Sequence, residues 1–174
     1  MGIIVLFLVH AALGGFQLAG MLAGGIRIMT VLSWIMAGLI AVHAVIGGIL
    51  TVRTLKAQKK AGVSYPAENK LFWTRRISGA AVMMFILLHI AVFVGKNSDG
   101  VFRLTLFDGA ALAGQILLVL SAALHAVTNI KPLMLSLGVK SYKEFALDLL
   151  MILSVILLLA GTGFVIYYKR WSVF

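Results

Sequence analysis

Five long apolar stretches dominate the chain, and short polar connections separate them. They occupy residues 2–23, 28–52, 77–95, 110–130 and 145–168. A helix that crosses a bilayer needs about 20 mostly apolar residues, and each stretch is of about that length. None of them alternates apolar with polar residues as a membrane β-strand does. The pattern therefore predicts an all-α membrane protein with five transmembrane helices, forming a single domain over residues 1–174.

Composition agrees with this pattern and narrows the chemistry. Of the 174 residues, 62% are hydrophobic and only 11% are charged, which is more apolar surface than a soluble domain of this length can bury. The chain has no cysteine. This excludes structural disulfides, iron–sulfur clusters held by thiolates of this chain, and covalent attachment of c-type haem. The connections are too short for a soluble domain, so we expect partner proteins to carry any chemistry on polar substrates.

The net charge of +10 predicts the topology rather than a nucleic-acid partner, because the basic residues lie in the connections. Five of them, Arg27, Lys96, Arg103, Lys169 and Arg170, fall on one side of the membrane if the helices alternate. The other ten fall on the opposite side, which is then predicted to be cytoplasmic, with the N-terminus inside and the C-terminus outside. These ten are Arg53, Lys56, Lys59, Lys60, Lys70, Arg75, Arg76, Lys131, Lys140 and Lys143.

The four histidines provide the main candidate chemistry. The first four apolar stretches contain one each, and the fifth has none; they are His10, His43, His89 and His125. Ionisable residues within a bilayer are costly and usually face the interior of the protein with a function. The alternative is that each histidine only forms a hydrogen bond to a neighbouring helix, which is less expected for one histidine on each of four helices.

Helical rise places the histidines at two depths. His43 lies about 15 Å and His125 about 9 Å from the predicted inner boundary, whereas His89 lies about 20 Å from it. His43 and His125 therefore form a predicted inner pair, and His10 is left to pair with His89 nearer the outside. Two axial pairs at two depths are typical of two stacked b-type haems in a bundle of the first four helices. A single metal site would require convergence at one level.

Residues near the histidines fit the same hypothesis. Gly14 and Gly47 each follow a histidine by four residues, on the same helix face, where small residues would let a flat macrocycle approach. They are also common in ordinary helix packing in membranes. Haem propionates need cationic or hydrogen-bonding partners near the water boundary. The candidates on the inner side, which are alternatively plain positive-inside anchors, are Arg53, Arg75, Arg76, Ser78 and Lys131.

At this point the chain resembles a known family over nearly all its length. The residues that carry the resemblance are Ile40-Ala-Val-His43, the basic connection with Ser64-Tyr65, Arg76-Ile-Ser-Gly79, Leu87-Leu-His89 and Leu120-Ser-Ala-Ala-Leu-His125. It is similar to the dihaem, five-helix cytochrome b membrane anchor of succinate:quinone and quinol:fumarate oxidoreductases. In that family the first four helices each give one haem ligand. The resemblance implies that His43 and His125 hold the inner haem, that His10 and His89 hold the outer one, and that Arg76 and Ser78 lie beside a propionate.

The resemblance also implies partners in a multi-pass complex of the cell (inner) membrane. These are a flavoprotein with covalently bound FAD and an iron–sulfur subunit, both docked on the cytoplasmic face. Electrons would pass between the iron–sulfur partner and a quinone, commonly menaquinone. No nucleic-acid partner is expected. The whole complex, rather than this chain alone, is the candidate for oligomerisation.

Two features depart from the family pattern. Little sequence precedes His10, so its helix begins unusually near the ligand. No acidic residue lies mid-membrane except Asp148 near the start of the fifth stretch, so a buried carboxylate for quinone protonation is not evident. Gln17 and Trp34 are candidates for the quinone site by polarity and depth alone. For both, a role in the connection or at the membrane interface is the more ordinary interpretation.

Two other function classes stay open. One is a dihaem cytochrome b of another respiratory complex, of the formate dehydrogenase or hydrogenase type, although the order of the ligands along the chain argues against it. The other is a haem-free small transporter or structural membrane protein whose histidines only form hydrogen bonds. The absence of inverted repeats and of broken helices counts mildly against transport.

Overall fold

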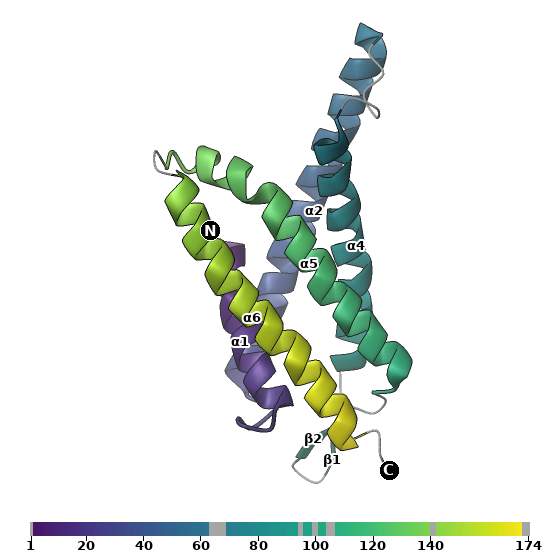
Figure 1. The fold of residues 1–174 in the computed structure, drawn as a ribbon. Coiled ribbons are helices and arrows are strands. Elements are labelled where there is room, and N and C mark those ends of the chain that lie inside the picture. The colour runs from purple at the N-terminus through teal and green to yellow at the C-terminus, as the bar shows by residue number, and fades with distance from the viewer. Residues whose placement is uncertain are drawn as a thin grey trace.

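The chain is almost entirely helical in the part that the structure describes. This computed structural model describes residues 2–62, 69–93, 96–98, 101–103, 107–139 and 142–171. The helices are α1 (Gly2–Leu18), α2 (Arg27–Ala61), α4 (Lys70–Phe93), α5 (Gly109–Ser136) and α6 (Tyr142–Trp171), as Figure 1 shows. Two short strands, β1 (Lys96–Ser98) and β2 (Val101–Arg103), pair antiparallel between α4 and α5, with Asn97 opposite Phe102.

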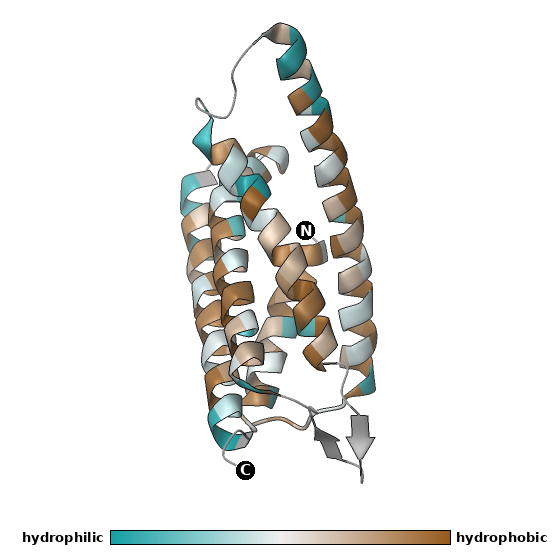
Figure 2. Cartoon of the chain, turned by 90° about the vertical axis from the view of Figure 1, so that its right-hand side faces the viewer, coloured by the Kyte–Doolittle hydropathy of each residue, from teal (hydrophilic) through white to brown (hydrophobic). Residues whose placement is uncertain are grey.

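Length and composition make this a multi-pass membrane protein. Helices α2, α4, α5 and α6 are each long and apolar enough to cross a membrane. Their middle turns are mostly hydrophobic, and hydrophilic residues gather near the helix ends (Figure 2). The all-helical class is therefore confirmed for the described residues. Helix α1 has 17 residues and is about 26 Å long, which is shorter than a bilayer core of about 30 Å. A fifth crossing by α1 stays a prediction.

Helices α2, α4, α5 and α6 extend beyond the predicted apolar stretches into the basic segments, whereas α1 ends at Leu18, short of the predicted residue 23. Most of the predicted connection between the second and third stretches is helix, because α2 continues to Ala61 and α4 begins at Lys70. Lysine and arginine are good helix formers once water surrounds them. Gly62 ends α2 with a φ of 68°, and the Asn69 side chain accepts a hydrogen bond from Phe72 N at the start of α4. The predicted positions Ser64, Tyr65 and Lys140 lie outside the described residues.

Helix α6 packs against both α1 and α5. Its buried residues Leu153, Leu157, Ala160 and Phe164 form one stripe at helical spacing. A Cβ atom at Gly163 would lie 3.1 Å from the carbonyl oxygen of Gly15, so the absence of side chains lets α1 and α6 approach closely. The sequence predicts a bundle of the first four helices, with the fifth giving no ligand. That bundle stays a prediction, and α6 is the helix that joins α1 to α5.

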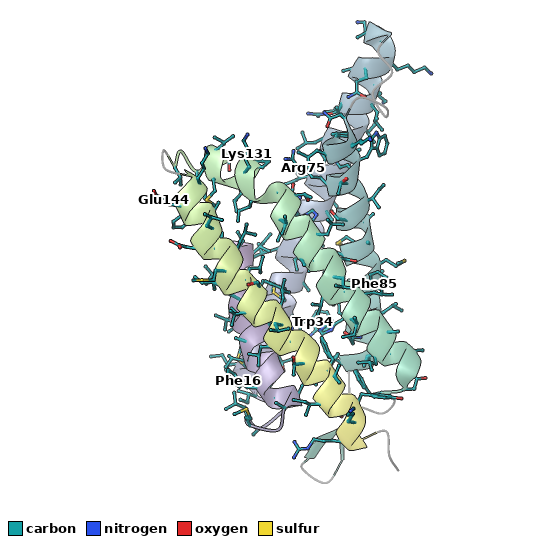
Figure 3. All side chains as sticks on the ribbon, in the orientation of Figure 1. Phe16, Trp34, Arg75, Phe85, Lys131 and Glu144 are labelled. Atoms are coloured by element: carbon teal, nitrogen blue, oxygen red, sulfur yellow. The ribbon has the colours of Figure 1, made fainter. Side chains whose placement is uncertain are left out.

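The connections alternate between two ends of the molecule (Figure 1). We call the basic end the one formed by the end of α2, the start of α4 and the α5–α6 connection. Arg75 and Lys131 both lie toward it (Figure 3). We call the opposite one the hairpin end, with the strands β1 and β2, the α1–α2 connection and the end of α6. The alternation places most of the basic residues at one end, as the predicted topology requires.

Candidate functional site

The four histidines come together in two pairs. In the hairpin-end pair, His10 of α1 and His89 of α4 have ring centroids 6.0 Å apart and ring planes at 76°. In the basic-end pair, His43 of α2 and His125 of α5 have centroids 6.4 Å apart and planes at 83°. These are the two pairs that the depths along the sequence group together.

The pairs lie at clearly different levels along the helices. On α5, Gln115 is hydrogen-bonded to His89 of one pair, and His125 belongs to the other. Ten residues of helix separate Gln115 from His125, which corresponds to about 15 Å. On α4, eleven residues separate His89 from Ser78, which contacts His125, and this corresponds to about 16 Å. Both helices therefore give the same spacing between the two sites.

Each pair reaches across two helices that do not pack closely against each other. Among the described helices, the close packing is between α4 and α5, α1 and α6, and α5 and α6, with α1 and α2 in looser contact. Neither α1 with α4 nor α2 with α5 is a packed pair. The imidazoles are thus the groups that bridge these helices, and their separation is set by the side chains rather than by backbone contact.

Side-chain oxygens determine which ring nitrogen carries the proton at the hairpin end. His89 Nδ1 lies 2.7 Å from Gln115 Oε1, which can only accept, so Nδ1 donates. His10 Nδ1 lies 2.9 Å from Ser33 Oγ, whose own proton goes to the carbonyl oxygen of Met29 at 2.7 Å. With the hydroxyl donating to that carbonyl, His10 Nδ1 can donate to Oγ. In that tautomer, as in His89, the lone pair is on Nε2, the nitrogen available to a metal.

At the basic end, His125 Nδ1 lies near both the Ser78 hydroxyl and, at 3.5 Å, the amide nitrogen of Asn129. Ser78 is 2% exposed, donates to the carbonyl oxygen of Arg75 at 3.2 Å and lies 3.3 Å from His125 Nδ1. Gly79 makes room for the ring, because a Cβ atom there would lie 3.2 Å from His125 Cε1. Asn129 donates from its amide nitrogen to the carbonyl oxygen of His125 at 2.7 Å. One turn of α4 and one turn of α5 together hold this imidazole.

Cationic and donor groups gather beside the basic-end pair. Arg75 Nε donates to the carbonyl oxygen of Thr128 at 2.7 Å and so ties α4 to α5. The Arg76 guanidinium lies 5.1 Å over the Phe72 ring, and its Nη1 is 3.8 Å from where a Cβ of Gly47 would be. Two buried N–H donors, Arg76 Nε and Trp73 Nε1, have no hydrogen-bond acceptor among the described residues. Donors left unpaired in an apolar medium are costly, so an acceptor-rich group suits this place.

The remaining predicted site residues lie apart from these contacts. Arg53 and Lys131 are exposed at the basic end, and Gly14 faces open space. The amide nitrogen of Gln17 donates to the carbonyl oxygen of Ala23 at 2.9 Å, which closes the α1–α2 connection. Trp34 is 58% exposed on α2. The hydrogen bond of Gln17 and the exposure of Trp34 fit roles in the connection and at the membrane interface, and a quinone role for either residue stays a prediction.

The separations within the pairs suit a metal between two imidazoles. Metal–nitrogen bonds of about 2 Å on opposite sides of one ion put the two ring centres about 6 Å apart. In the described residues, no group of three or more histidine, cysteine, aspartate or glutamate side chains could hold a metal. Two protein ligands leave the other coordination positions to a flat macrocycle, so the donor set fits haem better than a bare ion.

No protein-family model, curated protein or solved structure matches the chain. What supports a function is therefore the geometry of the histidines and their neighbours.

Sequence reasoning missed three contributors to this geometry. Ser33 and Gln115 bind the hairpin-end histidines, and Trp73 places a buried donor near Arg76. The signal available for Ser33 and Gln115 was a polar side chain inside an apolar stretch. Their partners are 23 and 26 residues away along the chain, so only the packing of the helices identifies them.

Proposed function

We propose that the chain is the dihaem cytochrome b membrane anchor of a succinate:quinone or quinol:fumarate oxidoreductase. The observation that carries the proposal is that the four histidines form two pairs at two levels, with ring centroids 6.0 and 6.4 Å apart. Each pair would hold one haem b, which supplies one-electron transfer. Electrons would then cross the membrane between the iron–sulfur partner and a quinone, with menaquinone the favoured species.

The chain's own residues have distinct tasks in this proposal. The histidines would bind through Nε2, while Ser33, Gln115 and Ser78 lie against the Nδ1 atoms of His10, His89 and His125 and so orient these three rings. Arg76 and Trp73 offer donors to a carboxylate at the basic end. The buried Gln115 and the apolar helices around the hairpin-end pair would lower the local dielectric there and strengthen its polar contacts.

Charge distribution supports the placement of partners. The basic end would face the cytoplasm by the positive-inside rule, so the flavoprotein with covalent FAD and the iron–sulfur subunit would dock there. The basic-end pair would then be the inner site and the hairpin-end pair the outer one. The complex would belong to the cell (inner) membrane, with the N-terminus of this chain inside and its C-terminus outside.

The first test is a reduced-minus-oxidised optical spectrum of the purified protein, with haem quantified per chain. We expect a b-type spectrum and two haems per chain. One haem per chain would contradict the dihaem assignment. A folded, fully loaded preparation without haem would overturn the electron-transfer function and leave a haem-free transporter or structural protein.

The identity of the complex needs a second experiment. Purification of the native complex from membranes should bring down a flavoprotein whose FAD stays attached after denaturation, together with an iron–sulfur subunit. A molybdenum or nickel subunit would instead identify a formate dehydrogenase or hydrogenase type, with the same two haem sites.

A further inference from the structure

Gln115 is the most completely buried polar side chain near the histidines. It is 0% exposed, in the second turn of α5, next to the buried Gly114, which faces Leu88 of α4. An amide in such surroundings is costly unless its polar atoms are paired. Its Oε1 pairs with His89 Nδ1 at 2.7 Å, but its Nε2 has no partner among the described residues.

This partial pairing is informative. A leucine at position 115 would fill similar space without leaving a buried donor unpaired, so the amide is present at a cost to stability. Within the described part of the chain, the hydrogen bond that its polar atoms make is the one with His89. The carbonyl oxygen of an amide is also a neutral acceptor of intermediate strength, weaker than a carboxylate. The side chain is therefore suited to set the properties of that imidazole.

We propose that Gln115 is a positioning residue that tunes the electron-donating strength of His89. By accepting a hydrogen bond from Nδ1–H, it holds the tautomer with the lone pair on Nε2, fixes the ring angle and raises the basicity of Nε2. A more basic ligand favours the oxidised metal and lowers the reduction potential at the hairpin-end pair. This inference rests on the proposed haem binding.

Two substitutions with opposite effects test it. Gln115→Leu removes the acceptor and keeps the bulk, whereas Gln115→Glu strengthens the acceptor. Redox titration with optical detection, and electron paramagnetic resonance of the oxidised protein, would report each haem in the purified chain. Gln58→Leu, near the end of α2 and distant from both pairs, is the matched control. The basic-end haem in the same molecule is the internal reference.

We expect Gln115→Leu to raise the potential of one haem and Gln115→Glu to lower the potential of the same haem. A tenfold change in the relative affinity for the two oxidation states corresponds to about 59 mV for one electron. The reference haem and the Gln58→Leu protein should keep their potentials. The resonance signal of the affected haem should change in both variants, since the ligand field at the iron changes.

The outcomes distinguish failure of the role of Gln115 from failure of the proposed function. Shifts of the same sign in both variants, or no shift with two haems bound, would overturn the role of Gln115 and leave the proposed function intact. If Gln115→Leu loses the hairpin-end haem, the Gln115→Glu variant still tests the role of Gln115: a lower potential of that haem supports the role, and an unchanged or higher one overturns it. A wild-type protein without haem would instead overturn the proposed function itself.

Discussion

The two histidine pairs have similar ring separations but different surroundings. At the hairpin end, neutral oxygens of Ser33 and Gln115 hold both rings at 2.9 and 2.7 Å, and Phe93 lies 4.6 Å from the His89 ring. At the basic end, the bond from His125 to Ser78 is 3.3 Å, and the arginines Arg75 and Arg76 lie on the adjoining turns of α4. If each pair holds a haem, as proposed, these two electrostatic environments would give the two haems different reduction potentials.

The pairs also differ in how firmly their helices are held. Helices α1 and α4 are packed against α6 and α5, whereas α2 has no buried residue and His43 itself is exposed. The hairpin-end pair is therefore organised by protein packing. Packing holds the basic-end pair less firmly, so its geometry would depend more on a group bound between His43 and His125. We expect loss of a bound group to loosen α2 more than any other helix.

The largest expected effect is the selective loss of one site. If the pairs hold haems as proposed, His89→Leu should abolish haem binding at the hairpin end and His43→Leu at the basic end, because each removes one of the two histidines of a pair. Each variant should retain one haem per chain in the pyridine haemochrome assay. Loss of both haems from a correctly folded variant, or of neither, would mean that the two pairs are not independent sites.

A bulkier residue at position 79 should disturb the basic-end pair alone. In Gly79→Val the new side chain meets the His125 ring, which a Cβ atom already approaches to 3.2 Å. Overpacking of this kind costs about 1–3 kcal/mol, so the basic-end haem should be lost or weakly held while the hairpin-end haem stays. Gly38→Val on α2, where nothing lies within 4 Å, is the control. Equal haem loss from both variants would contradict the contact.

Removal of a cation should sharpen the difference in potential. Arg76→Gln takes away a positive charge that favours the reduced state at the basic end. The reduction potential of the proposed basic-end haem should fall by roughly 60 mV, which is a tenfold change in the equilibrium constant of a one-electron couple. The hairpin-end potential should stay, since about 15 Å of helix lies between the sites. An equal fall at both sites in a redox titration would show that Arg76 acts through the overall charge.

The smallest effect should come from the α1–α6 contact at the hairpin end. Arg170 Nη1 donates to the carbonyl oxygen of Ala19 at 3.0 Å, against Gly20, whose φ is 77°. Arg170→Ala should lower thermal stability slightly, by about 0.5–1.5 kcal/mol for one hydrogen bond, with both haems retained. Lys169→Ala, at the exposed neighbouring position, should leave the melting temperature unchanged. Equal melting temperatures for the two variants would contradict a stabilising role for this bond.

Much of this molecule could be predicted from short-range sequence patterns. Apolar stretches of about 20 residues predict membrane helices because the bilayer satisfies no backbone polar groups. The helical rise is constant, so the depths of His43, His89 and His125 follow from counting residues to the basic boundaries. Helix ends were less predictable, since apolar length does not record where a lysine-rich helix such as α2 stops in water.

The sequence by itself determined the helical class, the membrane environment, one histidine on each of four helices and their grouping at two depths. Only the tertiary structure decided that Gln115 and Ser33 lie against the Nδ1 atoms of His89 and His10, that Gly79 makes room for His125, and that α6 packs between α1 and α5. The physical reason is the range of the interactions. Hydropathy and helical rise act along a few turns of one helix, whereas hydrogen bonds and packing depend on how separate helices rotate against one another.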